Sequence, residues 1–257
     1  MKDTSILKLA SVALLCSHLA WANVGLSVDQ FPTPYNTEPE QSEPMSAEQA
    51  AQTAVLPPGF HCEVFASEPD VQQPIAMCFD HRGRLWVAES FTYAERPQRW
   101  ADDLRDRVII LEDTDGDGRA DQRKVFWDQA DHLTSVAHDG QGVYALCAPH
   151  LLYLPDADDD DLPDGEPQIL LDGFAVEEAS HNVVNGLKIG PDGWLYGRHG
   201  ILSSSRVGTP TSTPDQRKTL NCSIWRYHPK SKAFEVYCHG GTNPWGMDWN
   251  ADGQLFY

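Results

Sequence analysis

One pattern recurs four times along the chain: a short strand-like run, a polar turn with glycine, and a second run rich in aromatic and β-branched residues. The four copies are AMCFDHRGRLWVAE (76–89), SVAHDGQGVYALC (135–147), LKIGPDGWLYGRHG (187–200) and MDWNADGQLFY (247–257). Their turn glycines are Gly83, Gly142, Gly193 and Gly253, at spacings of 59, 51 and 60 positions. A tight turn that needs a positive φ angle explains the glycine. The pattern therefore predicts β-hairpins at a regular spacing.

A second kind of hairpin falls between these copies, in RVIILEDTDGDGRADQRKVFW, HLLYLPDADDDDLPDGEPQILL and SIWRYHPKSKAFEVY. Each unit then holds about four strands, which at this period is typical of a β-propeller blade. A lone hairpin cannot bury its apolar face, so neighbouring blades must cover it. We expect an all-β fold, a β-propeller over residues 56–257, with about three and a half blades. Because the last copy stops at Tyr257 within a strand-like run, we expect this propeller to be incomplete at its C-terminus.

The first 55 residues have a different composition. Lys2 and Lys8, the apolar run ILKLASVALLC and the small residues Ala20 and Ala22 predict a signal peptide over residues 1–22. An uncleaved anchor is the alternative. Residues 23–55 are rich in Pro, Glu, Gln and Ser, which predicts a disordered linker with one helical turn around SAEQAAQTA. No later apolar run reaches the ~18 residues of a spanning helix. We therefore expect a secreted protein, periplasmic or extracellular, with no transmembrane segment after the signal peptide.

Charge and cysteine content limit the kinds of partner and cofactor that we expect. The formal net charge of −19 argues against nucleic acid, because no basic stripe exists to neutralise phosphates, and it suits cation binding. Five cysteines remain after Cys16, an odd number whose pairing the sequence does not determine. None has C-x-x-C-H spacing, so no haem site is encoded in this chain.

Two turns of the second hairpin type are strongly acidic, DTDGDGRAD from Asp113 and DADDDDLPD from Asp156. Both have Asp at relative positions 1, 3, 5 and 9, which can supply most of the six to eight oxygens that calcium takes. The candidate ligands are Asp113, Asp115, Asp117 and Asp121 in the first loop and Asp156, Asp158, Asp160 and Asp164 in the second. Position 12 is Lys124 or Pro167, so these are not EF-hand loops. The alternative is a solvated turn, since Asp and Gly are common turn residues.

Residues 46–257 resemble the membrane-bound dehydrogenase N-terminal domain of planctomycete-type and verrucomicrobial secreted proteins. The resemblance rests on LPPGFHCEVFASEPDVQQPIAMCFDHRGRLWVAES and IGPDGWLYGRHG. That domain is similar in turn to the six-bladed propellers of PQQ-dependent glucose and sorbosone dehydrogenases. The resemblance implies a six-bladed propeller in the full protein and a sugar or polyol substrate. It also makes PQQ a candidate cofactor, with a quinone or a partner cytochrome as electron acceptor.

The resemblance also suggests site residues. His181, close to the place of the catalytic base, is the candidate base. Asn243 and Pro244 match an Arg-Asn-Pro motif, but Thr242 stands where those enzymes carry a quinone-contacting arginine, so Arg198 is the candidate for the missing charge. The candidate cofactor- or substrate-binding residues are Asn185, Arg198, His199 and Asn243. We expect His181, Asn185, Arg198 and Asn243 to share one rim near the propeller axis. The alternative for Arg198 and His199 is that they satisfy backbone carbonyls between blades.

The leading hypothesis is a secreted propeller oxidoreductase acting on a sugar or polyol. A non-catalytic glycan- or protein-binding propeller and a calcium-dependent, lactonase-like hydrolase are the alternatives. The polar insertion SSSRVGTPTSTPDQRKT (203–219) either covers a binding face or is a disordered excursion. We interpret Trp86, Trp194, Trp225, Trp245 and Trp249 as blade packing, because they stand at strand positions.

Overall fold

The structure, a computed structural model, describes residues 44–94, 98–177 and 183–257. The predicted signal peptide (1–22), the predicted linker up to residue 43 and the candidate base His181 lie outside the described residues. No helix in the described part of the chain is long and apolar enough to cross a membrane.

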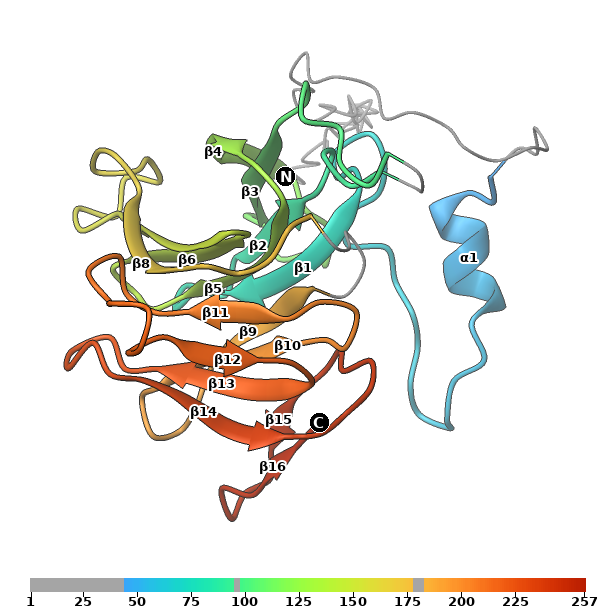
Figure 1. The fold of residues 1–257 in the computed structure, drawn as a ribbon. Helices are drawn as coiled ribbons and strands as arrows, with labels where there is room; N and C mark the ends of the chain where they lie inside the picture. Colours follow the sequence, from blue (N-terminus) through green and yellow to red (C-terminus); the bar gives the residue numbers. More distant parts are fainter. Residues whose placement is uncertain (1–43, 95–97, 178–182) are drawn as a thin grey trace, which may run out of the picture.

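Three four-stranded antiparallel sheets form the body of the molecule (Figure 1). Blade 1 contains β1 (Pro74–Phe79), β2 (Leu85–Glu89), β3 (Asp106–Glu112) and β4 (Gln122–Ala130). Blade 2 contains β5 (Leu133–His138), β6 (Gly142–Cys147), β7 (His150–Pro155) and β8 (Gln168–Asp172). Blade 3 contains β9 (Val184–Ile189), β10 (Leu195–His199), β13 (Ser223–Tyr227) and β14 (Phe234–His239). The hairpin of β15 (Asp248–Trp249) and β16 (Leu255–Phe256) follows.

The three blades are arranged around their first strands. β1 lies next to β5 and β5 next to β9, whereas the last strands β4, β8 and β14 lie at the periphery (Figure 1). This is the arrangement of a β-propeller, and the described residues form three complete blades and the first hairpin of a fourth, as the repeat predicted.

The blades bury one another's faces. Trp86 of blade 1 packs in one cluster with Leu133 and Val136 of blade 2, and Phe174 packs with Trp225 of blade 3 in another. Each of these side chains is almost completely buried. Burial of one large apolar side chain contributes roughly 1.5–3 kcal/mol, so packing between neighbouring blades stabilises each of them.

Three of the four glycines expected in the hairpin turns lie in those turns, and the fourth position differs. Gly83, Gly193 and Gly253 occupy their turns with φ of +80°, +76° and +76°. In the second copy the turn residue is Gly140, with φ +91°, and Gly142 begins β6. The expectation for Gly142 was wrong because a longer polar run, DGQG, offers two glycines and the strand pairing selects the first.

The N-terminal segment carries one short helix, α1 (Ala47–Thr53). Ser46 and Gln49 close a capping box, in which the Ser46 hydroxyl accepts from the Gln49 amide and the Gln49 side chain accepts from the Ser46 amide. No residue of the helix is buried, and it stands apart from the sheets (Figure 1). The helical segment expected around SAEQAAQTA is thus a helix of about two turns.

The polar insertion is an ordered hairpin of β11 (Ser205–Val207) and β12 (Lys218–Leu220). Gly208 forms a bridge with Asp172 at the end of β8, and Arg217 pairs with the Asp172 carboxylate. Val207 and Leu220 are buried in the cluster between blades 2 and 3. The insertion is therefore neither a disordered excursion nor a cover over the pocket described below. It fills the space between two blades.

The propeller has two rims, which we name by the first strand of each blade. At the start rim β1, β5 and β9 begin; at the turn rim their hairpin turns lie. Because neighbouring strands are antiparallel, the β3–β4 and β7–β8 loops also lie at the turn rim, and β10 ends at the start rim.

Candidate functional site

A pocket of about 200 Å³ opens between the first strands of the blades, towards the propeller axis. It is lined by residues 75–77 of β1, 134 and 135 of β5, 185–188 of β9, Arg198 of β10 and residues 245–247 before β15. Three blades and the chain that enters the fourth therefore contribute to one cavity. Ligand sites in propellers and barrels are commonly built this way, from several elements around one axis.

Arg198 is a fully enclosed cation of this lining, at 1% exposure. Its backbone pairs with Asn185 across the β9–β10 ladder, so the two residues stand side by side. Within the described residues, the Nε and Nη1 atoms of Arg198 are buried and have no hydrogen-bond partner. Burial lowers the pKa of Arg198 to about 10, which still leaves the guanidinium charged at neutral pH.

A bulge in β9 makes room for this side chain. Tyr196 pairs with Lys188 and Arg198 with Asn185, so Gly186 and Leu187 together face the single residue Gly197. Gly186 has φ +65°, as expected for a bulge with glycine in the left-handed region. The Leu187 amide, freed from the ladder, donates to Ser135 Oγ of blade 2 at 2.8 Å. The bulge thus ties two blades together beneath the pocket.

Of the residues expected at one rim, Asn185 and Arg198 lie together at the pocket. Asn243 is exposed and stands two residues before Trp245, which lines the pocket. His199 is buried and points elsewhere: its Nε2 lies 2.6 Å from Ser205 Oγ and its Nδ1 lies 2.9 Å from the Gly200 carbonyl oxygen. His199 therefore anchors the start of the insertion to β10.

Sequence reasoning missed two contributors to the pocket. Trp245 is 51% exposed and lines the cavity, whereas Trp86 and Trp225 are fully buried between blades as expected. The signal for Trp245 was its place in TNPWG, directly after the matched Asn-Pro pair. The role of Gly186 had no signal, because a bulge is defined only by the pairing of two strands.

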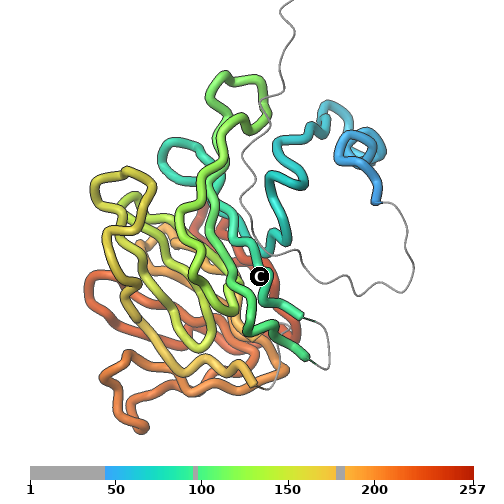
Figure 2. Tube along the Cα trace, turned by 90° about the horizontal axis from the view of Figure 1, so that it is seen from above, coloured from blue at the N-terminus to red at the C-terminus, as the bar shows by residue number. Residues whose placement is uncertain are grey.

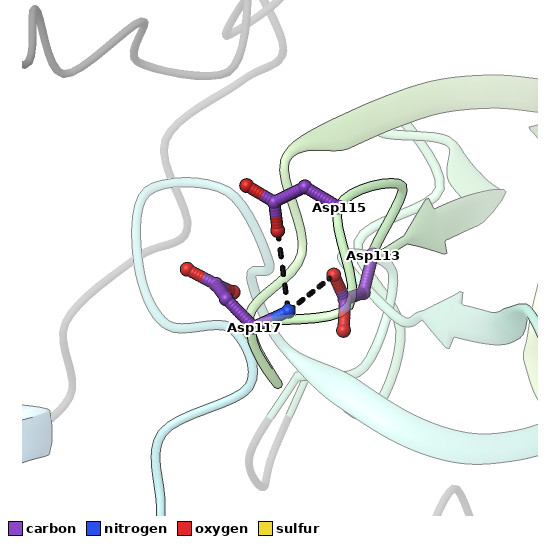
Figure 3. A group of neighbouring side chains, drawn as sticks. All are labelled: Asp113, Asp115 and Asp117. Atoms are coloured by element: carbon purple, nitrogen blue, oxygen red, sulfur yellow. Dashed lines mark hydrogen bonds between the residues drawn. The ribbon is translucent and has the colours of Figure 1, made fainter.

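The first acidic loop joins β3 to β4 and gathers three carboxylates (Figure 3). Asp113, Asp115 and Asp117 each have an oxygen within 4.8 Å of the others. Asp113 accepts hydrogen bonds from the amides of Gly116 at 2.7 Å and Gly118 at 2.9 Å, and the Gly118 amide contributes most to holding its pKa low. Such a group of ionised oxygens fits a hard cation.

Asp121, at position 9 of this loop, is not part of the group. Its carboxylate accepts from the Thr114 amide and hydroxyl and so closes the loop. In the second loop, Asp164 accepts from the Ala157 amide at 2.7 Å in the same way. Position 9 thus has one role in both loops, which is to hold the amide of position 2.

The second acidic loop joins β7 to β8, so both loops occupy the equivalent turn of successive blades, as expected. Their backbones match: positions 4 and 6 have positive φ in each, as Gly116 and Gly118 in the first and as Asp159 and Asp161 in the second. Asp tolerates this conformation better than most residues. Asp156, Asp158 and Asp160 form one group of neighbouring carboxylates, and Asp156, Asp159 and Asp161 form another.

Arginine and lysine side chains of blade 1 form ion pairs with two carboxylates of the second loop. The Asp161 carboxylate forms ion pairs with Arg84 Nη2 at 2.7 Å and Lys124 Nζ at 3.2 Å. The Asp159 carboxylate forms one with Arg82 Nη2 at 2.7 Å. The second loop, yellow in Figure 2, accordingly lies beside the turn after β1. No Lys or Arg of the described chain pairs with the carboxylates of Asp113, Asp115 or Asp117, and the same holds for Asp156, Asp158 and Asp160 of the second loop. Through Asp159 and Asp161 the second loop therefore acts as an electrostatic contact between blades.

Both acidic loops lie at the turn rim, whereas the pocket is built from the starts of β5 and β9 and the end of β10. A cation held by these loops would stabilise turns and would not contact a ligand in the pocket.

The fold is that of a β-propeller domain with a pocket between the first strands of its blades. The chain belongs to the family described as Domain of unknown function (DUF7133), whose model matches residues 46–257. No curated protein is similar enough to count as a match.

Solved structures with related folds include the PQQ-bound aldose sugar dehydrogenase of Streptomyces coelicolor, at 17% identity and a TM-score of 0.48. A proposed oxidoreductase (glucose dehydrogenase) of Thermus thermophilus has 19% identity and a TM-score of 0.44. Each match covers 72% of this chain and 56% of the other. The chain thus spans little more than half the length of these structures. A proposed 6-phosphogluconolactonase of Bacteroides fragilis has 11% identity and a TM-score of 0.39, over 70% of this chain and 48% of that one.

Proposed function

We propose that this domain is part of a secreted oxidoreductase that oxidises a sugar or polyol at the axial pocket, in the manner of a quinoprotein dehydrogenase. The observation that carries the proposal is the composition of the pocket. It combines the amide of Asn185, the guanidinium of Arg198, the hydroxyls of Thr134 and Ser135, and the exposed indole of Trp245. Sugars present hydroxyls and flat C–H faces, and sites for them pair polar groups with an aromatic ring.

Each chain residue has a proposed task. Trp245 packs against the carbon face of the sugar, and the amide of Asn185 orients a hydroxyl. His181, three positions before β9 in the sequence, takes the proton of the hydroxyl that is oxidised, because a neutral imidazole is a good base near pH 7. The nearly buried apolar side chains of Leu187 and Met247 limit the access of water to the reacting atoms.

One residue of the pocket, Arg198, has the chemistry to bind a quinone cofactor. PQQ carries carboxylates, and Arg198 offers two buried nitrogens without a partner in the described chain, although Thr242 replaces the arginine of related dehydrogenases. When bound, PQQ accepts the two electrons and the hydrogen that leave the substrate carbon. Arg198 would then hold the cofactor by a charge-assisted hydrogen bond.

The proposals for localisation and electron acceptor rest on the sequence. The predicted signal peptide favours a periplasmic or extracellular protein of the planctomycete and verrucomicrobial type, where a quinone or partner cytochrome takes the electrons. The first acidic loop is proposed to bind calcium. In the second loop, Arg84 and Lys124 pair with Asp161 beside the candidate ligands, and their positive charge weakens the attraction of a further cation.

The decisive experiment is reconstitution of the full-length protein with PQQ and calcium, followed by a dye-reduction screen across sugars and polyols. Turnover by the wild type is expected to fall about 10²- to 10⁴-fold in His181→Ala, the range that a general base contributes. His61→Ala, an exposed histidine beside the N-terminal segment, is the control and should keep full activity.

Each other outcome points to an alternative. Dye reduction with no sugar, together with sugar binding in calorimetry, would identify a glycan-binding propeller. Acid release from lactones in the presence of calcium would identify a lactonase-like hydrolase. A fully active His181→Ala variant would remove the base assignment alone.

A further inference from the structure

We infer that the axial pocket is a carboxylate-binding site and that Arg198, held in place by the bulge at Gly186, is the residue that binds the carboxylate. The inference deepens the proposed function and rests on its pocket, because the carboxylate belongs either to a quinone cofactor or to an acidic sugar substrate.

The first argument compares Arg198 with other buried arginines. Arg84 contacts Asp80 and Asp161, and Arg107 contacts Glu89. Arg198 is as buried as these, but no carboxylate of the described chain pairs with it. A buried charge without a partner destabilises the folded state, so its retention at this place requires a compensating ligand.

The second argument is that the chain builds a place for this side chain. A Cβ at position 186 would lie 2.1 Å from Arg198 Nη2 and 2.5 Å from Nε, so the guanidinium occupies the space that any other residue would fill. The left-handed φ of Gly186 and the bulge belong to the same arrangement. A backbone distorted to seat one cation indicates a function for that cation.

The third argument concerns the surroundings of the charge. Within the described ranges, backbone carbonyls do not satisfy Nε and Nη1, which argues against the purely structural role considered from the sequence. Lys188, another cation of the lining, is held by Asp248 at 2.7 Å. The neighbouring lining is partly apolar, with the nearly buried side chains of Leu187 and Met247, and a low dielectric strengthens a charge pair. A planar carboxylate matches the fork of the guanidinium.

The test measures binding without turnover. The full-length protein is titrated calorimetrically with PQQ, with gluconate and with neutral glucose, and its thermal unfolding is recorded with and without each compound. The variants are Arg198→Met, which keeps the volume and removes the charge, and Gly186→Ala, which displaces the guanidinium. Arg226→Met is the matched control, because Arg226 lies on the next strand of the same blade, pairs with Asp192 and Glu235, and lies outside the pocket.

We expect Arg198→Met and Gly186→Ala to weaken binding of the carboxylate compound about tenfold to a hundredfold, as for loss of a hydrogen bond to a charged group, and Arg226→Met to leave it unchanged. Without ligand, Arg198→Met should unfold at the same or a higher temperature than the wild type, because it removes an unpaired buried charge. Arg226→Met should unfold at a lower temperature.

The two arms distinguish the sources. Arg198-dependent binding of PQQ assigns the carboxylate to the cofactor, and Arg198-dependent binding of gluconate assigns it to the substrate. Affinities for both compounds that are equal in wild type and Arg198→Met, or a ligand-free Arg198→Met protein that is clearly less stable than the wild type, would overturn the inference. Carboxylate binding without any dye reduction would support this site and reject the oxidoreductase, so the two proposals fail separately.

Discussion

The guanidinium of Arg198 lies against the Cα of Gly186, so closely that a methyl group at position 186 would stand 2.1 Å from Nη2. These residues come from neighbouring strands, β9 and β10, and the bulge in β9 exists where the two meet. The shape of the pocket floor is therefore set by one contact between a backbone and a charged side chain.

This contact predicts different costs for alanine at two glycines of the same hairpin. Gly193 has φ +76° and open space around it, so Gly193→Ala should cost only backbone strain, about 1 kcal/mol. Gly186→Ala adds displacement of Arg198 and should cost about 3 kcal/mol or more. Urea unfolding of both variants measures the free energies, and a difference below about 0.5 kcal/mol would show that Arg198 moves away freely.

A second prediction concerns acid stability through Asp80 in the β1–β2 turn. Burial raises the pKa of Asp80, but hydrogen bonds from Trp86 Nε1, at 3.0 Å, and from Arg84 outweigh burial and lower the pKa to about 2. The folded pKa is thus below the ordinary value of 3.8, so the stabilisation is present above about pH 4 and is lost as the pH falls towards 2. The shift corresponds to about 2 kcal/mol.

The measurement for Asp80 is the free energy of unfolding as a function of pH for the wild type and Asp80→Asn. The variant should be less stable by about 2 kcal/mol at pH 7, and the two curves should approach each other near pH 2. A constant gap from pH 7 to pH 2 would mean that the charge of Asp80 contributes nothing.

The contact between blades 1 and 2 gives a third prediction. Burial raises the pKa of Asp161, and the Arg84 and Lys124 cations more than offset it, so the carboxylate stays ionised. Asp161→Asn removes three ion pairs, with Arg82, Lys124 and the buried Arg84, and should cost about 2 kcal/mol. Asp158→Asn, an exposed neighbour in the same loop, should change stability by less than about 0.5 kcal/mol. Equal effects of the two variants in thermal unfolding would contradict the ion-pair role.

Calcium binding gives the fourth prediction. Calorimetric titration should show a calcium heat for the wild type that disappears in Asp115→Ala, which removes one of three converging carboxylates. Asp158→Ala should retain that heat, because Asp158 lies in the other loop, where Arg84 and Lys124 beside the candidate ligands weaken the attraction of a further cation. Since the loops lie at the rim opposite the pocket, chelation should lower the unfolding temperature without changing ligand affinity at the pocket. Equal heats for wild type and Asp115→Ala would identify the first loop as a plain turn.

The local sequence pattern was enough to predict much of the fold. Hairpins follow from alternating apolar runs and turn glycines, and their regular recurrence gave the blades and the equivalence of the two acidic loops. The choice of Gly140 over Gly142 was missed because the residues of the turn are fixed by strand register, which depends on the partner strand as well as on the turn sequence.

The site was only partly predictable for the same reason. Asn185 and Arg198 are thirteen positions apart, yet the β9–β10 register makes them neighbours. Trp245 was expected to pack because it was placed in a strand, but it lies before β15 and is exposed. His199 stands beside Arg198 in sequence but serves the insertion, because successive side chains of a strand point to opposite faces.

By itself, the sequence determined the strand-and-turn repeat, the acidic turns and the residue types available for chemistry, because periodicity, glycine turns and charge are local properties. Only the tertiary structure decided which of the described charges are neutralised by a partner and which are not. Asp161 meets Arg84 across two blades, whereas Arg198 is enclosed against Gly186 without a carboxylate from the described chain. The physical reason is that burial and pairing of a charge depend on residues far apart in the chain, which meet only when the blades pack.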